Sequence, residues 1–307
     1  MHRMCLVVLA LLLTTFGYAD GQAVGTRMRN VVFHLDHGIE LRVDDLAGQL
    51  VSRKPGRPPV FDDVNAYLVE IVSARVSMTA ESLTNLMNDY VFAYPDAPLK
   101  GLKITIEGNE LHQSGTLKKG VGVPFSMRAT VAATSDGKIR IHPTTMKAAG
   151  FVPKGVLDFF GLELERLVKL KQTPAVNIVG DDLLLDPERL LPPPQIKGKL
   201  TKAWIENGVV FEQFGSADKR PTLAPPDARA RNYMYYRGGV LKFGKLTMED
   251  TDLLLVDANQ KNPFDFSPAE YNRQLVAGYS KNTPSHGLIV YMPDLSELNS
   301  RTAAKRR

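Results

Sequence analysis

Apolar and polar residues alternate along most of the chain, and this period of two predicts β-strands with one buried face. The alternation is clearest at residues 31–43, 66–78, 102–119, 123–141, 199–214 and 240–258, the last of which predicts two strands. Turn-forming residues interrupt it at Asp36-His37-Gly38, Glu107-Gly108-Asn109, Ser135-Asp136-Gly137 and Asn207-Gly208. Short turns of this kind join antiparallel neighbours, so the chain is expected to be rich in β-hairpins.

The hairpin at residues 124–150 raises the main functional question. Its apolar side carries Phe125, Met127, Ala129 and Val131, followed by Ile139 and Ile141 after the turn. The polar side contains no catalytic pattern. The apolar side is therefore either plain core or the wall of a cavity that holds an apolar ligand.

Helices are few in the predicted pattern. Thr79 is a good N-cap for a helix that places Leu83, Leu86 and Met87 on one face. A longer apolar helix is predicted from Val156 to Leu170. Shorter helices are expected near Pro187–Leu191 and Pro268–Ala277.

The order of these elements predicts a β-rich domain at residues 27–214 and a C-terminal β/α part at residues 232–295 that packs on the same domain. Residues 215–231 are rich in proline, alanine and charge without periodicity, which is typical of a linker. Residues 296–307 are predicted to form a basic tail.

The first residues indicate export. A short basic start precedes an apolar run from Cys5 to Phe16, and Gly17-Tyr18-Ala19 suits cleavage of a signal peptide at residues 1–19. An uncleaved anchor remains the alternative. Cys5 is the single cysteine of the 307 residues, so the exported chain would contain no disulfide. Export without cysteines favours a bacterial periplasmic or cell-envelope protein.

Composition and motifs give little sign of catalysis. Hydrophobic residues make up 44% of the chain, charged residues 23%, and the net charge is +5, values typical of a globular protein without a nucleic-acid-binding profile. Neither a metalloprotease motif, a nucleophile elbow nor a phosphate-binding loop is present. We therefore expect no catalytic residue, no metal and no cofactor.

The apolar faces of so many strands need a cover, because a sheet must pack against another layer or close on itself. The helix at Val156–Leu170 would fit inside a strongly curved sheet and leave a groove of lipid size. A simple packed core stays open as the alternative interpretation of the same pattern.

The stretch from residue 68 to residue 215 resembles the LmeA-like phospholipid-binding family of bacterial envelope proteins. The similarity lies in the helix "TAESLTNLMN", the hairpin that starts at "LKGLKITIEGNEL", the hairpin that starts at "PFSMRATV", the segment "GVLDFFGLEL" and the later "PPPQIKGKLTKAWIENGVVFEQFG". This resemblance implies an α+β, tubular lipid-binding fold, in which a long, strongly curved antiparallel sheet wraps around an apolar helix. The residues expected to line its cavity are Ile104, Ile106, Phe125, Met127, Ala129, Val131, Val156, Phe160 and Leu164.

Three functions follow as hypotheses. The first is an exported protein that binds or transfers lipid, with phospholipid as the expected ligand, in an elongated apolar groove. Its partner would be a lipid or membrane surface, with acidic headgroups near Lys100, Lys118, Lys119, Lys147 and Lys154. The second is an envelope scaffold with a fully packed core. The third is a lipid- or glycan-directed hydrolase, which would need Asp181, Asp182 or His286 in one cleft.

Overall fold

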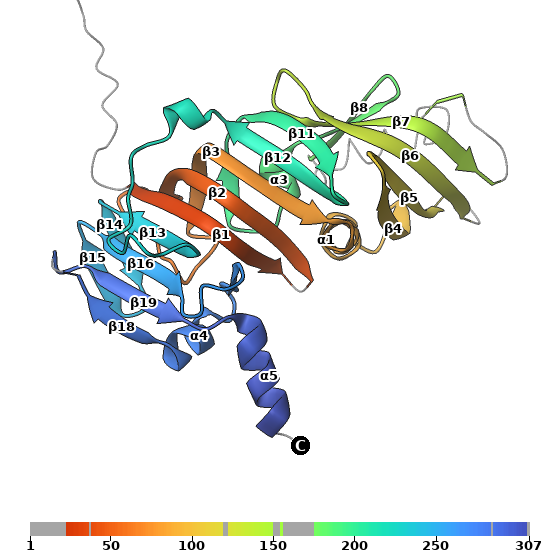
Figure 1. Ribbon diagram of the computed structural model, residues 1–307. Helices are drawn as coiled ribbons and strands as arrows, with labels where there is room; N and C mark the ends of the chain where they lie inside the picture. Colours follow the sequence, from red (N-terminus) through yellow and green to blue (C-terminus); the bar gives the residue numbers. More distant parts are fainter. Residues whose placement is uncertain are drawn as a thin grey trace, which may run out of the picture.

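The fold is mostly β-structure, as the alternating pattern predicts. The computed structural model describes residues 23–36, 38–118, 122–149, 154–155, 175–283 and 285–305. Its strands form an eleven-stranded, a six-stranded and a two-stranded sheet. In Figure 1 the six-stranded sheet lies beside one end of the eleven-stranded sheet, and the short helix α1 lies between them.

The eleven-stranded sheet combines the first hairpin with the C-terminal strands. In spatial order it contains β11 (Leu200–Glu206), β12 (Val209–Gly215), β3 (Tyr67–Thr79), β2 (Ile39–Ser52), β1 (Val24–Asp36), β13 (Tyr233–Arg237), β16 (Asp252–Asp257), β19 (Leu288–Met292) and β18 (Tyr279–Asn282). Two short strands pair in parallel beside this path, β10 (Gln195–Lys197) with β3 and β17 (Phe264–Phe266) with β1.

The six-stranded sheet is built from consecutive hairpins. Its order is β4 (Leu99–Glu107), β5 (Glu110–Leu117), β6 (Val123–Ala133), β7 (Ile139–Ala148), β9 (Asp182–Leu185) and β8 (Val176–Val179). The two-stranded sheet pairs β14 (Val240–Phe243) with β15 (Leu246–Glu249). Residues 240–258 thus form three strands, β14, β15 and β16, and not the predicted two.

Short helices connect and flank the sheets. They are α1 (Ala80–Asn85), the π-helix η1 (Leu86–Val91), α3 (Pro187–Leu190), the 3-10 helix η2 (Ala217–Lys219), α4 (Tyr271–Ala277) and α5 (Leu295–Lys305). None of the described helices is long and apolar enough to cross a membrane. The Thr79 hydroxyl accepts a hydrogen bond from the Ser82 amide at 3.1 Å, which confirms the predicted N-cap.

The predicted turns are confirmed at the β4–β5, β6–β7 and β11–β12 hairpins, whereas the fourth includes His37, which lies outside the described residues. Gly108, Gly137 and Gly208 have positive φ angles of 61°, 88° and 75°, which glycine adopts without a steric penalty. The register follows from the turns, with Glu107 opposite Glu110 and Glu206 opposite Val209. These local signals therefore determine the antiparallel pairs that are close in sequence.

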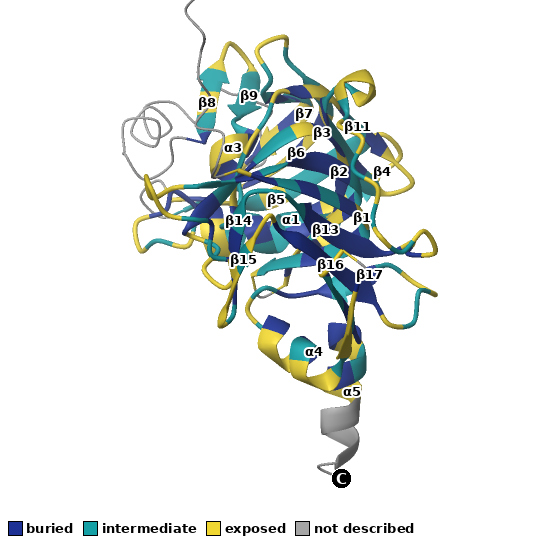
Figure 2. Ribbon diagram, turned by 90° about the vertical axis from the view of Figure 1, so that its left-hand side faces the viewer, coloured by how far each residue is buried: buried dark blue, intermediate teal, exposed yellow. Residues whose placement is uncertain are grey.

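Both large sheets contribute to the main hydrophobic core, which also includes Phe61, Phe243 on β14 and Tyr271 on α4. The eleven-stranded sheet contributes Leu46 and Met78, and the six-stranded sheet contributes Phe125, Met127 and Ala129, all at most 6% exposed. Figure 2 shows this burial as alternating dark and light positions along the strands. The apolar faces of the two sheets are thus buried in one shared core.

The predicted tubular α+β fold is wrong. The chain is 54% strand, and its sheets are flat and uncurled where one long, strongly curved sheet was expected. Among the described helices the longest is α5, which projects from the sheets at the edge of the molecule (Figure 1). The predicted helix at residues 156–170 lies outside the described residues. The physical reason for the difference is the break at α1 and η1, after which β4 begins a second sheet that does not continue the hydrogen bonding of the first.

The C-terminal part shares the eleven-stranded sheet with the N-terminal hairpin. Strand β13 pairs with β1 over five residues, from Tyr233 opposite Arg29 to Arg237 opposite Gly25. Between β12 and β13 the only regular element is η2, within the segment predicted as a linker. Helix α5 occupies residues 295–305, where the sequence predicts a basic tail.

Candidate functional site

An apolar pocket lies between the two large sheets, and we call it the interlayer pocket. Leu41 on β2, Met78 on β3 and Val210 on β12 line it from the eleven-stranded sheet. The other sheet contributes Ile104, Leu111, Gln113, Val131, Ile139, Ile141 and Leu185. The pocket has a volume of about 70 Å³. One buried water needs only about 10–15 Å³, so the pocket is a narrow slot with room for several small groups.

Short helices form the ends of the interlayer pocket. Leu83 on α1 and Leu86 and Met87 on η1 line one side, and Pro187 and Leu190 on α3 line another. A π-helix is rare and is often found at functional sites. Methionine side chains are flexible, so this wall can adapt its shape to a ligand.

Glu212 on β12 is the only ionisable group in the pocket wall that the structure describes. It alternates with Val210 and Phe214, which are 5% and 1% exposed, so its side chain points to the buried face of the strand. Burial raises the pKa of the Glu212 carboxyl from 4.5 to about 7. No hydrogen bond or ion pair joins this carboxyl to another described side chain.

The second polar wall residue is Gln113 on β5. It comes from the opposite sheet and shares its face with the pocket residue Leu111. Glu212 and Gln113 are thus the two polar groups in an otherwise apolar wall. The sequence analysis missed both, although the position of Glu212 between Val210 and Phe214 in an alternating strand was a usable signal.

The residues predicted to line a cavity take different places. Ile104 and Val131 line the interlayer pocket. Phe125, Met127 and Ala129 are packed into the core, at 5%, 5% and 0% exposure. Ile106 is half-buried near the turn after β4. Val156, Phe160 and Leu164 lie outside the described residues.

The acidic residues proposed for a hydrolase are engaged elsewhere. Asp182 on β9 accepts hydrogen bonds from Arg140 at 2.5 Å and His142 at 2.7 Å. Burial alone would raise the pKa of the Asp182 carboxyl, but these two partners outweigh it and lower the pKa. His286 lies in the loop between β18 and β19 of the other sheet, so the structure does not bring this acid and this base together.

Ser285 does not form a catalytic triad with its neighbour His286. Its hydroxyl donates directly to the Asp252 carboxylate at 2.8 Å, and the Thr283 hydroxyl lies 3.0 Å away. A triad needs the histidine between the serine and the acid. In the described part of the chain, no group of three or more His, Cys, Asp and Glu side chains has a geometry that would hold a metal ion.

We compared the chain with protein-family models, with curated protein sequences and with solved structures. None of the three comparisons finds a match. The resemblance to the LmeA-like phospholipid-binding family therefore stays a prediction from the quoted motifs.

Proposed function

We propose that the protein binds a lipid, with part of an acyl chain in the interlayer pocket, and performs no chemical step on it. The supporting observation is the pocket wall, in which Gln113 and Glu212 are the only polar members among the described residues. Ligand sites of proteins commonly combine an apolar wall with a few placed polar groups. The predicted signal peptide favours the bacterial envelope as the place of action.

Burial of hydrocarbon would supply the binding free energy. Each methylene group that leaves water for an apolar pocket contributes about 0.8 kcal/mol. The present volume of about 70 Å³ admits a short stretch of chain. A longer stretch requires Met78 and Met87 to change rotamer, which their unbranched side chains allow at low cost.

Glu212 would set the polarity of the bound group. Its carboxyl, with a pKa of about 7, is largely protonated below neutral pH and is then able to donate a hydrogen bond. A lipid ester or carboxyl group near Glu212 would accept this bond. An ionised Glu212 would oppose the entry of hydrocarbon, because a carboxylate loses its hydration there.

A fluorescent-lipid titration tests the proposal. The mature chain is titrated with a phospholipid that carries a fluorescent acyl chain, and native lipid is extracted and identified by mass spectrometry. Val131→Phe, which fills the pocket, should weaken binding by about tenfold, equal to 1.4 kcal/mol. Val72→Phe is the matched control, because Val72 on β3 is 36% exposed and outside the pocket wall.

Two results would contradict lipid binding. One is an extract without lipid together with no saturable titration of the wild-type chain. The other is equal weakening by Val131→Phe and Val72→Phe when both variants remain folded by circular dichroism. The small pocket volume favours a second candidate in that case, an envelope scaffold whose interlayer space is simply core.

A further inference from the structure

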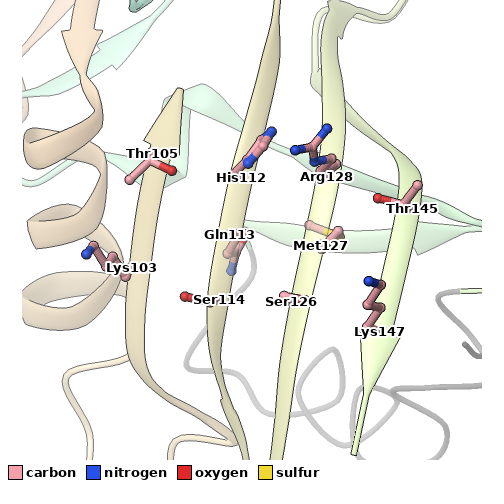
Figure 3. A pocket seen from close by; sticks show the side chains of 10 residues that line it. All are labelled: Lys103, Thr105, His112, Gln113, Ser114, Ser126, Met127, Arg128, Thr145 and Lys147. Carbon is pink, nitrogen blue, oxygen red and sulfur yellow. The ribbon is translucent and has the colours of Figure 1, made fainter. Parts of the chain in front are cut away.

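The outer face of the six-stranded sheet carries a second hollow, which shares the lining residue Gln113 with the interlayer pocket. It has a volume of about 590 Å³ and lies over β4, β5, β6 and β7 (Figure 3). Lys103, Arg128 and Lys147 give it positive charge, with His112 beside them. None of the described residues that line it is acidic.

The strand register arranges these side chains in two rows across the sheet. Lys103 pairs with Ser114, Ser114 with Ser126, and Ser126 with Lys147, so the first row has two hydroxyls between two lysines. The second row lies two residues away from the first on each strand, later in β4 and β6 and earlier in β5 and β7. It runs from Thr105 through His112 and Arg128 to Thr145, with two basic groups between two hydroxyls.

The first row matches the dimensions of a phosphate group. Neighbouring strands are about 4.8 Å apart, so Lys103 and Lys147 attach to the sheet about 14 Å apart with the serines between them. Extended lysine side chains that lean inward reach an anion at the centre from both sides. Serine hydroxyls there donate further hydrogen bonds, and a lysine ammonium is a compact charge that suits phosphate.

Lys103 and Lys147 have no ion-pair partner among the described residues, unlike Arg128. Arg128 lies 3.5 Å from Glu107 and 4.0 Å from Glu110 at the end of the face. The side chains of Arg128 and Glu107 are 52% and 64% exposed, so their attraction is weak and leaves Arg128 able to turn toward an anion. The two lysines are therefore the main charge available in the first row.

We propose that this hollow binds the phosphate group of a soluble phosphorylated molecule, between Lys103 and Lys147 on the hydroxyls of Ser114 and Ser126. Its shape and border argue against a membrane as the occupant. Glu107 and Glu110 would be repelled by an anionic lipid surface. Of the large hydrophobic residues more than a third exposed in the described chain, only Val179 on the edge strand β8 lies on this face, and it does not line the hollow.

Isothermal titration calorimetry with glucose 6-phosphate tests this site at pH 7 and low salt, with glucose as the uncharged control ligand. Glucose 6-phosphate should bind saturably with one site per chain, and glucose should not bind. The double variant Lys103→Gln/Lys147→Gln should weaken binding by more than about tenfold. Ser114→Ala/Ser126→Ala, which keeps the charge, should weaken it by about three- to tenfold, because it removes neutral donors.

The matched control is Lys219→Gln/Lys261→Gln. Both lysines are exposed and lie outside the six-stranded sheet. Their substitution removes the same net charge as the Lys103→Gln/Lys147→Gln variant. The control should bind glucose 6-phosphate like the wild type. Equal weakening in both lysine double variants, or no saturable binding by the wild type, would overturn the proposal.

Vesicles identify the competing occupant. The protein is sedimented with vesicles of phosphatidylglycerol and phosphatidylcholine. Lys103- and Lys147-dependent sedimentation without glucose 6-phosphate binding would also overturn the proposal in favour of a membrane. None of the four substituted residues lines the interlayer pocket, so failure here leaves the lipid proposal unaffected, and the reverse also holds.

Discussion

The side-chain amide of Asn88 pairs with both backbone groups of Leu102. The Asn88 Nδ2 donates to the Leu102 carbonyl at 2.7 Å, and the Leu102 amide donates to the Asn88 Oδ1 at 2.9 Å. One turn earlier, the Thr84 hydroxyl accepts from the Ile104 amide at 3.0 Å. Side chains of α1 and η1 thus occupy the free edge of β4, where an exposed strand would otherwise invite pairing with another chain.

These contacts also hold the helical wall of the interlayer pocket in place. Leu86 and Met87 line the pocket from the same helical segment that Asn88 ties to β4. We therefore expect Asn88→Ala to lower the free energy of unfolding by about 2–3 kcal/mol, because two backbone groups of buried Leu102 lose their partner. Urea unfolding followed by circular dichroism measures this change.

The neighbouring Asp89→Ala is the control for Asn88→Ala. Asp89 is exposed, and a substitution at such a position normally changes stability by less than about 0.5 kcal/mol. Asn88→Asp should give an intermediate loss, since a carboxylate accepts from the Leu102 amide and cannot donate to the Leu102 carbonyl. If Asn88→Ala is as stable as the wild type, the hydrogen bonds between Asn88 and the edge strand β4 do not contribute to stability.

Glu212 should make the stability of the protein depend on pH. Its folded-state pKa of about 7 lies above the ordinary 4.5, so folding favours the protonated form. The cost of burying the carboxyl is absent below pH 4.5, develops as pH rises from 4.5 to 7, and is constant above 7. Glu212→Gln should therefore be more stable than the wild type by about 2 kcal/mol at pH 8 and nearly equal at pH 4.5.

Chemical denaturation at a series of pH values tests the sign of the Glu212 effect. Glu249→Gln on β15 serves as the control for removal of an exposed carboxyl, and its stability profile should run parallel to that of the wild type. A Glu212→Gln profile parallel to the wild type between pH 4.5 and 7 would show that the Glu212 carboxyl is well hydrated.

The ion pair between His34 on β1 and Asp265 on β17 predicts a second loss of stability with rising pH. The distance between His34 Nε2 and Asp265 Oδ1 is 2.5 Å. The hydrogen bond to Asp265 raises the pKa of His34 above 6.5, although burial opposes it. A raised histidine pKa gives stability that is fully present below pH 6.5 and is lost as pH rises through the folded pKa.

His34→Asn should therefore lower stability by about 1–2 kcal/mol at pH 5.5, and by less at pH 8.5. Unfolding in urea at the two pH values measures the difference. His286→Asn is the control, because His286 is exposed with a φ of 64°, a conformation that asparagine tolerates. An equal loss from His34→Asn at both pH values would mean that His34 is neutral in the folded state.

The sequence predicted the local structure better than the arrangement of the sheets. Hairpin turns such as Asn207-Gly208 and the helix cap at Thr79 depend on interactions within a few residues, so the sequence alone can predict them. Parallel pairs such as β1 with β17 and β16 with β19 join segments that other strands separate. Periodicity identifies the buried face of each strand and says nothing about its partner, which is why two packed sheets were mistaken for one curved sheet.

The candidate site was accessible to sequence reasoning only in part. The buried faces of β4 and β6 were identified, and Ile104 and Val131 do line the interlayer pocket. Some buried residues line the pocket and others are fully packed. The difference depends on how the two sheets are placed relative to each other, which the sequence pattern does not give. Phe125 and Met127 share the pattern of Val131 and are core residues for this reason.

The close approach of β2 and β3 at Gly48 gives a last prediction. The register shifts between Ala47 and Gly48, and a Cβ atom on Gly48 would lie 2.1 Å from the Glu70 carbonyl oxygen. Since this neighbour is backbone, it cannot move aside without separating the two strands. Gly48→Ala should lower the free energy of unfolding by more than about 2 kcal/mol.

Gly56→Ala separates this steric effect from the loss of glycine flexibility. Gly56 has a φ of 72°, and a Cβ atom added there would have no neighbouring atom within 4 Å, so alanine meets only the penalty of about 1–2 kcal/mol for a left-handed conformation. Hydrogen exchange at the amides of β3 should accelerate in Gly48→Ala and stay unchanged in Gly56→Ala. Equal stability of the two variants would mean that β2 and β3 have room for a side chain at Gly48, and that the register shift does not depend on glycine.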